Sequence, residues 1–305
     1  MDGIINLYKP RGYTSHDAVA RIKRFCGTRR VGHAGTLDPM AEGVLPVLVG
    51  RATTAQDHIM SRTKSYRAGM RFGTVTDTGD ITGEVLKTLP VSLDEQTVMQ
   101  AASAFIGKIS QVPPMYSAIK IDGKKLYELA REGVTVERKA RDIEIYSITL
   151  VRADNGTDFV LDVTCSKGTY IRTLCEDIGQ KLGCGGTLFS LERRVSGIFS
   201  VENSVTIEQL EKAYEQGGTA AMEQFIIPPE KVFDTFPKIK LSEFYTRLCK
   251  NGCEIYLKKA HIDEQKFPVG TEVRLYGHDG AFFAIGKCGI FRDGAAIKST
   301  VRFCD

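Results

Sequence analysis

Asp38 is a lone carboxylate at the end of a short segment that is rich in arginine and glycine. The segment reads RRVGHAGTLDP, residues 29–39, and the apolar run GVLPVLVG follows it. Gly32, Gly35 and Thr36 indicate a tightly bent loop, and loops on a rigid scaffold commonly carry functional groups. A second interpretation stays open, because Asp before Pro also begins a short helical turn in which the carboxylate is the cap.

His33 is a single histidine within this loop. No serine or cysteine nucleophile motif accompanies it, which disfavours a role as the base of a catalytic triad. The pattern favours either a hydrogen-bonded structural histidine or a contact to a phosphate group.

Two clusters of basic residues suggest a polyanionic partner, although the net charge of +4 is modest. The first consists of Lys9, Arg11, Arg21, Lys23, Arg24, Arg29 and Arg30, with Asp17 as its one acid. The second consists of Lys120, Lys124, Lys125, Arg131, Arg138, Lys139 and Arg141, interspersed with Asp122, Glu128, Glu132 and Glu137. Such clusters fit the phosphates of a nucleic acid. Solvated faces of surface helices explain either cluster equally well by itself.

The composition is that of an ordinary globular protein, with 305 residues, 42% hydrophobic and 26% charged. No stretch approaches the roughly 18 apolar residues that a membrane span needs, and the N-terminus lacks the apolar core of a secretory signal. We therefore expect a cytoplasmic protein. The eight cysteines form no C-x-x-C pair, which favours structural thiols over a metal site. No phosphate-binding glycine loop, dinucleotide motif or metal-ligand spacing occurs, and no metal site is expected.

The elements that must position Asp38 can be read from periodicity and capping signals. Residues 14–27 predict an amphipathic helix capped by Thr14 or Ser15, and residues 43–50 predict a buried strand in which Pro46 argues for an edge or a bulge. Residues 92–107 predict a helix that opens with Ser92 and Glu95 at capping-box spacing and closes on Gly107.

The order of strands and helices predicts an α/β or α+β fold with a mixed, mainly antiparallel sheet. Residues 109–141 read as an excursion from this sheet, and the turn DNG joins two strands on either side of residues 154–156. We expect a large domain over residues 1–235. A proline-bearing linker then leads to a small β-rich domain over residues 236–305.

Six separated motifs resemble one known family. They are NLYKPRGYTSHDAV, RRVGHAGTLDPMAEGVLPVLVGRATT, KSYRAGMRFGTVTDTGDITGEV, PPMYSAIKIDGKKLYELAREG, CSKGTYIRTLCEDIG and LERRVSGIFS. Their order and spacing are similar to those of the bacterial tRNA pseudouridine synthases that modify uridine 55 in the T loop, the TruB family. The resemblance is dense over residues 3 to about 200. The tail more loosely resembles the family's small RNA-binding PUA-like domain.

The resemblance implies a reaction that detaches uracil from ribose, turns it and rejoins it through carbon, without a cofactor. Asp38 would be the catalytic carboxylate, and Arg172 of the Tyr-Ile-Arg motif would lie beside it. A guanidinium there would keep a desolvated carboxylate ionised and fix its direction. The alternative for Arg172 is a surface charge on the first turn of a helix, where a cation gains nothing from the helix dipole.

Further site residues are carried over from the same motifs. Tyr66 would stack on the flipped base and take the proton that leaves the base carbon, although KSYRAG alone favours a core aromatic. Tyr170 and Leu191 would line the uracil pocket. Lys9 and Pro10 resemble a loop that braces the catalytic one.

The resemblance also gives the basic clusters a function, because a uridine stacked in a T loop must be swung out before it can react. Residues 109–141 resemble a thumb that closes over the T stem-loop, and His33 lies in the loop that fills the vacated space. Lys9 and Gly35 are expected to contact the substrate as well. The expected contacts to the RNA backbone come from Arg29, Arg30, Lys120, Lys124 and Lys125. We expect a monomer that acts on tRNA without a guide RNA. The alternatives are a guide-dependent relative of this enzyme and an RNA chaperone.

Overall fold

The computed structural model describes residues 1–121 and 123–304; Asp122, one of the acids in the second basic cluster, lies outside them. Within these residues a large mixed sheet contains nine strands. Its main path runs β1 (Gly3–Lys9), β3 (Glu42–Val49), β12 (Gly186–Ser196), β4 (Lys64–Phe72), β11 (Asp158–Cys165), β10 (Arg141–Asp154) and β7 (Gly107–Gln111). Two short strands, β2 (Val31–His33) and β13 (Phe199–Ser200), pair with β3 and β12.

The pairing in this sheet is antiparallel except between β12 and β3, which run parallel at residues 192–193 and 42–43. The prediction of a mixed, mainly antiparallel sheet is therefore confirmed. The hairpin of β10 and β11 turns at Asn155 and Gly156, both of which have positive φ angles, as the DNG sequence predicted.

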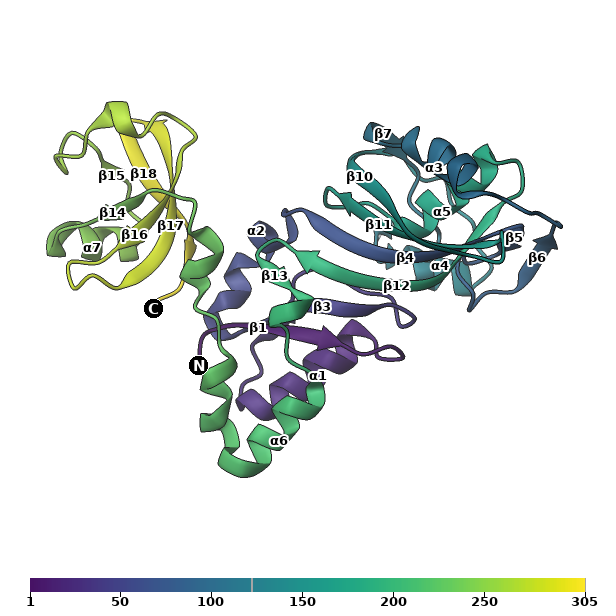
Figure 1. Ribbon diagram of the computed structural model, residues 1–305. Coiled ribbons are helices and arrows are strands. Elements are labelled where there is room, and N and C mark those ends of the chain that lie inside the picture. Colours follow the sequence, from purple (N-terminus) through teal and green to yellow (C-terminus); the bar gives the residue numbers. More distant parts are fainter. Residues whose placement is uncertain (122, 305) are drawn as a thin grey trace.

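Helices pack at both ends of this sheet (Figure 1). Helices α1 (Ser15–Cys26) and α6 (Ile207–Gly217) lie at the β1–β3 end, whereas α3 (Glu95–Ser103) and α5 (Ile171–Lys181) lie at the β10–β11 end. One continuous apolar cluster joins residues of all four helices to the sheet. The loop that carries Asp38 leaves β2 and enters β3, so both of its ends are anchored in paired strands of this sheet.

The predicted excursion starts later than expected, because residues 109–111 belong to edge strand β7. The inserted segment contains β8 (Lys120–Ile121), β9 (Lys124–Lys125) and α4 (Leu126–Arg131). The Arg138 guanidinium donates to the Pro113 carbonyl at 3.1 Å and ties the two ends of the segment together. A separate hairpin, β5 (Thr74–Thr76) and β6 (Val85–Thr88), follows β4.

A second sheet is formed by the last part of the chain, as expected. Its order is β14 (Lys238–Lys240), β16 (Glu272–Tyr276), β17 (Phe282–Phe291), β18 (Gly294–Arg302) and β15 (Ile255–Tyr256), with helix α7 (Glu243–Lys250) beside it. The sequence analysis did not predict β14 or α7.

The proline-bearing segment between the two sheets is not a loose linker. It forms the 3₁₀ helix η4 (Pro229–Phe233), and Phe233 is fully buried in an apolar cluster that draws on both sheets. That cluster includes Ile4, Val44, Leu48, Ile285 and Val301. The remaining short helices are η1 (Gly50–Ala55), α2 (Gln56–Met60), η2 (Val201–Asn203), η3 (Gly218–Phe225) and η5 (Glu264–Lys266).

Two local predictions need correction. Helix α3 is capped by Asp94, whose carboxylate accepts the Thr97 N–H at 2.7 Å, and the helix ends at Ser103 rather than Gly107. Pro46 lies in an interior strand, not at an edge or a bulge. It stands between the residues of β3 that pair with β12 and those that pair with β2, where a missing N–H breaks neither ladder.

The capping of α1 agrees with prediction. Thr14 and Asp17 form a capping box, and Gly27 ends the helix in the left-handed region with φ 60°. No helix among the described residues is long and apolar enough to cross a membrane.

Candidate active site

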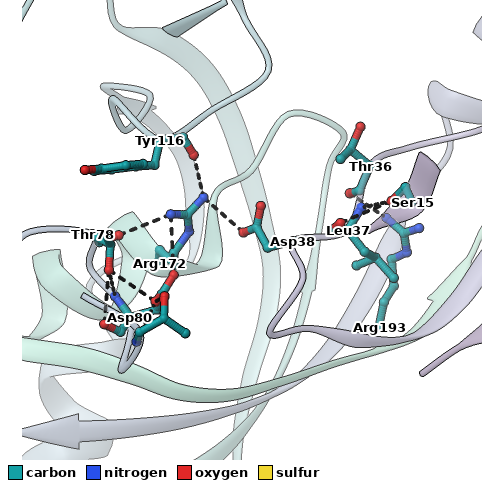
Figure 2. A network of polar contacts seen from close by, with 10 residues as sticks. Ser15, Thr36, Leu37, Asp38, Thr78, Asp80, Tyr116, Arg172 and Arg193 are labelled. Carbon is teal, nitrogen blue, oxygen red and sulfur yellow. Dashed lines mark hydrogen bonds and ion pairs between the residues drawn. The ribbon is translucent and has the colours of Figure 1, made fainter. Parts of the chain in front are cut away.

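Asp38 and Arg172 are in contact, as the resemblance implied. The Asp38 Oδ2 atom lies 3.0 Å from an Arg172 guanidinium nitrogen, and Figure 2 shows the two side chains pointing toward one another. Asp38 comes from the β2–β3 loop and Arg172 from the first turn of α5. The Arg172 side chain is only 6% exposed whereas that of Asp38 is 37% exposed, so the carboxylate keeps one side accessible to a ligand.

Arg172 is not the surface charge that the alternative interpretation allowed. Its guanidinium donates to the Tyr116 carbonyl at 2.7 Å and to the Thr78 carbonyl at 3.1 Å. It also lies 3.6 Å from Asp80 Oδ2. These contacts come from the inserted segment and from the β5–β6 turn, so one buried cation joins both to the Asp38 loop (Figure 2).

Asp80 is a site residue that the sequence analysis missed. Its side chain is 5% exposed, and Oδ1 accepts the Thr82 N–H at 2.9 Å and the hydroxyls of Thr82 and Thr78 at 2.5 and 3.1 Å. These bonds fix the Asp80 carboxylate beside Arg172, which contacts Asp38 as well. The segment TDTGDITGEV signalled only a turn, and no local pattern distinguishes a turn aspartate that pairs with a distant arginine.

The electrostatics of Asp38 reflect two opposed effects. Burial among protein groups raises the pKa of the Asp38 carboxyl, while the charge of Arg172 lowers it; Asp80 raises it and Lys9 lowers it further. The net direction is upward. An acid in this setting is more basic than a free aspartate, and the guanidinium still directs its charged form.

The Asp38 loop is held by the segment after β1. The Ser15 hydroxyl accepts the Leu37 N–H at 2.9 Å and donates to the Leu37 carbonyl at 3.1 Å, and the Gly12 N–H donates to the Pro39 carbonyl at 2.7 Å. Within the loop, the Asp38 carbonyl accepts the Ala41 N–H. The carboxylate is thus free to pair with Arg172.

Lys9 supports this segment from inside. It is fully buried, and its ammonium donates to the carbonyls of Pro10 and Tyr13 at 2.9 and 2.7 Å. Its inclusion in a phosphate-binding surface cluster was therefore wrong. Burial lowers the pKa of Lys9 to about 8, opposed by the charge of Asp38.

Tyr66 lies in β4 directly opposite Arg193 of β12, and its side chain is almost completely buried. Burial raises the pKa of the Tyr66 hydroxyl; a side-chain contact with Arg193 lowers it, and the charge of Asp38 raises it. The hydroxyl therefore lies within electrostatic reach of Asp38. Arg193 was not singled out from the sequence, because its contacts all come from distant parts of the chain.

Tyr170 and Leu191 lie on neighbouring elements. Tyr170 is the residue before α5, and its N–H and C=O bond to the buried Gln111 side chain at 2.8 and 3.1 Å. Burial raises the pKa of its hydroxyl, with smaller opposed effects from Ser117 and from the charge of Asp38. Leu191 is 8% exposed and lies opposite Ala68 of β4.

His33 ends β2, and its buried Nδ1 atom has no hydrogen-bond partner among the described residues. Burial, and then the nearby His16 and Arg193, lower the pKa of His33 to about 4. The ring is therefore neutral at pH 7 and does not attract a phosphate by charge. Gly35 follows with φ +99°, and its carbonyl accepts from Arg193 at 2.9 Å.

The predicted backbone-contact residues lie mostly at the surface. Arg29, Lys120 and Lys124 are exposed; Arg30 is exposed and bonds the Thr53 hydroxyl at 2.9 Å. The Lys125 ammonium bonds the Tyr127 hydroxyl at 3.1 Å. The structure brings Asp38 and Arg172 into contact and places the hydroxyls of Tyr66 and Tyr170 within electrostatic reach of Asp38. It leaves these cations spread over the β2 region and the inserted segment.

The chemistry available at this site is that of a carboxylate directed by a buried guanidinium, with a buried phenol within electrostatic reach. A carboxylate so placed can act as a nucleophile or as a base, and the phenol can move a proton. The cysteines are free thiols, and no group of three or more His, Cys, Asp or Glu side chains within the described ranges could hold a metal ion.

Comparisons with known proteins identify the family. Residues 23–171 match the family described as TruB family pseudouridylate synthase (N terminal domain). Residues 172–234 match the tRNA pseudouridylate synthase B C-terminal domain. The tRNA pseudouridine synthase B of Clostridium perfringens is 43% identical over 288 residues, covering 94% of this chain and 95% of the relative. That of Clostridium tetani is 44% identical, covering 94% and 96%.

Solved structures agree with this assignment. The chain resembles a protein in the crystal structure of a Cbf5-Nop10-Gar1 complex with a TM-score of 0.73 and 27% identity, over 99% of this chain and 85% of that one. A protein in an H/ACA RNP bound to a substrate RNA containing 2'-deoxyuridine gives the same TM-score at 25% identity, also over 99% and 85%. The sequence match over most of the chain is decisive: this protein belongs to the TruB family of pseudouridylate synthases.

Proposed function

We propose that this protein converts uridine 55 in the T loop of tRNA to pseudouridine. Family membership makes it an isomerase. The relatives from Clostridium are named as tRNA pseudouridine synthases, which supports tRNA as the substrate. The single observation that carries the proposal is the 3.0 Å contact between a half-exposed Asp38 and a buried Arg172.

In the proposed reaction Asp38 attacks the nucleotide, and the bond between N1 of uracil and C1′ of ribose breaks. The base turns, C5 forms the new bond to C1′, and the bond between Asp38 and the nucleotide breaks, which regenerates the carboxylate. Tyr66 takes the proton that C5 releases, and N1 is protonated in the product, so atoms and electrons balance without a redox partner. Arg172 keeps Asp38 ionised and directed throughout.

The uridine must leave its stack to reach Asp38, at a cost of a few kcal/mol. We propose that residues 109–141 close over the T stem-loop and that the exposed cations Arg29, Arg30, Lys120 and Lys124 contact its backbone. His33, neutral and with an unpaired nitrogen, suits the space that the base vacates. Residues 1–235 would form the catalytic domain, and residues 236–305 a PUA-like RNA-binding domain.

A guide-dependent enzyme is the second candidate, because the solved neighbours come from assemblies with further proteins or with RNA. We favour a stand-alone monomer in the cytoplasm. The match to the tRNA pseudouridine synthases covers 94% of this chain at 43% identity, against 27% identity to the Cbf5 complex.

The test is incubation of the purified protein with an unmodified tRNA transcript, without guide RNA or partner proteins, followed by pseudouridine mapping. We expect modification at position 55 and none in a transcript that carries cytidine there. Asp38→Asn should abolish modification while tRNA binding persists. Modification only on addition of a guide would favour the second candidate. An Asp38→Asn protein that modifies normally would remove Asp38 from the mechanism and leave an RNA chaperone to be considered.

A further inference from the structure

Arg193 is a fully buried arginine that the reaction described above does not use. Its side chain is 1% exposed, and it is the largest fully buried side chain in the described part of the chain. None of the ion pairs between described residues includes it, although each of the other buried arginines, Arg172 and Arg274, has carboxylate partners. A buried guanidinium without a carboxylate is expensive to desolvate, so its presence requires a physical reason.

Its hydrogen bonds to backbone carbonyls all reach residues 35–44, the stretch that contains Asp38. The Arg193 guanidinium donates to the Gly35 carbonyl at 2.9 Å and to the Val44 carbonyl at 2.7 Å, on either side of Asp38. A longer contact of 3.5 Å reaches the Thr36 carbonyl. Figure 2 shows Arg193 at the Thr36–Leu37 side of the loop, away from Arg172. The loop is therefore held by one guanidinium at its base and by another at its carboxylate.

The glycine spacing of the loop is explained by this arginine. Gly35 has φ +99°, and a Cβ atom there would lie 3.3 Å from an Arg193 nitrogen. Gly43 has φ +101°, and a Cβ atom there would lie 2.4 Å from the Arg193 carbonyl oxygen. Both glycines let the backbone approach Arg193 closely. The sequence GTLDPMAEG is thus a loop shaped around a side chain that follows much later in the chain.

Arg193 also reaches Tyr66. The two residues are direct partners across the β12–β4 ladder, and their side chains are in contact. The charged or ionisable groups that act on the Tyr66 hydroxyl are Arg193 from β12, Cys165 from β11 and Asp38 from its loop. Arg193 is the cation among these, and it favours negative charge on the phenol oxygen while burial and the other two oppose it.

We propose that Arg193 is a positioning residue that fixes the Asp38 loop and the Tyr66 hydroxyl relative to each other and stabilises the phenolate form of Tyr66, which is the form that can take a proton. The inference rests on the proposed function. A neutral donor could satisfy the carbonyl oxygens, whereas a cation also stabilises a phenolate by its charge. We take this as the reason for a buried charge at a point where three backbone carbonyls and one phenol converge.

The test compares Arg193→Lys and Arg193→Gln with Arg194→Gln, a control at the next position, where the side chain pairs with Glu192 and Glu202 near the surface. Single-turnover modification of a tRNA transcript, tRNA affinity and thermal unfolding are measured for each. Arg193→Lys keeps the positive charge but lacks the several fixed donors of the planar guanidinium. We expect about a 10²-fold slower single-turnover rate with unchanged tRNA affinity. Arg194→Gln should behave as the wild type.

The charge contribution is isolated by repeating the series in a Tyr66→Phe background. We expect Arg193→Gln to shift the rise of rate with pH to higher pH, and Arg193→Lys to shift it less. In the Tyr66→Phe background both changes should have a smaller effect on rate. If Arg193→Gln does not fold, Arg193→Lys measured with and without Tyr66→Phe supplies the same double-mutant comparison. Ultraviolet difference titration, with and without Tyr66, reads the phenol directly and needs no activity.

Two results would overturn the inference. One is an additive loss of rate, equal with and without Tyr66; the other is a phenol titration that Arg193→Lys and Arg193→Gln leave unchanged. Arg193 would then be a packing residue only. If the wild type and Arg194→Gln both fail to modify tRNA, the proposed function fails instead, and the titration still decides whether Arg193 acts on Tyr66.

Discussion

Asp38 and Asp80 face the same guanidinium from different depths. Asp38 lies 3.0 Å from Arg172 with 37% of its side chain exposed, and Asp80 lies 3.6 Å away with 5% exposed. One oxygen of the buried Asp80 carboxylate accepts three hydrogen bonds from Thr78 and Thr82. The Asp38 carboxylate, in contrast, retains a side that is open to solvent. The arrangement separates a fixed counter-charge from a carboxylate that is available to substrate.

Replacing Asp80 should slow the reaction and change its pH dependence. Asp80→Asn removes a negative charge that raises the pKa of Asp38, so the acidic limb of the pH–rate profile should move to lower pH. The single-turnover rate should fall by about 10- to 100-fold because Arg172 loses one of its anchors. Rapid-quench kinetics across a pH series measures both effects. Asp77→Asn, an exposed aspartate of the same turn, is the matched control, and an unshifted limb in Asp80→Asn would contradict the proposed coupling.

Replacing Arg172 with lysine should show that shape matters as well as charge. A lysine ammonium cannot contact Asp38, Asp80 and two backbone carbonyls together, so the rate should fall by about 10³-fold while tRNA affinity is retained. Arg71→Lys, at an exposed bidentate pair with Asp158, serves as the control. Equal losses of rate and affinity in Arg172→Lys would indicate an RNA-contact role instead.

His33 should make stability depend on pH. Its folded pKa of about 4 lies below the ordinary value of 6.5, so the unfolded chain binds more protons between these values and stability falls as pH drops from 6.5 toward 4. Between pH 7 and pH 5 the loss due to His33 should be about 1–2 kcal/mol after allowance for partial exposure. Urea unfolding at both pH values tests this. His33→Gln should lose less stability on acidification than the wild type, whereas His278→Gln, at an exposed histidine between β16 and β17, should lose as much as the wild type.

The exposed lysines of the inserted segment should govern affinity and its salt dependence. Lys120→Gln with Lys124→Gln should weaken tRNA binding and lower the slope of log affinity against log salt by about one for each phosphate that the protein no longer neutralises. The single-turnover rate at saturating protein should stay near that of the wild type. Filter binding over a salt series gives the slope, with Lys181→Gln at the far end of α5 as the control. An unchanged slope would mean that these lysines face away from the RNA.

Local signals in the sequence predicted the elements that depend on local contacts. Thr14, Asp17 and Gly27 define α1 through bonds within a few residues, and Asn155 with Gly156 defines a hairpin through backbone conformation alone. The cap of α3 was mispredicted because Ser92 and Asp94 are both good caps two residues apart. Propensity does not decide between them, and the Thr97 N–H pairs with Asp94.

The site itself could be predicted only where motif resemblance supplied long-range pairing. Asp38 and Arg172 were placed together on that basis, and the structure shows their contact. Asp80 and Arg193 were not predicted, because no local sequence pattern shows which distant residues a turn aspartate or a strand arginine will contact. The Val44 carbonyl that Arg193 bonds is 149 residues away in the chain. Lys9 was misassigned because a lysine in a basic segment gives no sign of complete burial.

The segment from Ala34 to Pro39 is tethered from several directions, by Ser15, Gly12, Arg193 and Arg172. These contacts already fix the conformation of the segment in the free protein, so it has little freedom to adapt to a nucleic acid. Under the proposed function, the rearrangement falls on the RNA. Transfer RNAs that share the same target base should then be modified at speeds that follow how readily each unwinds its own loop.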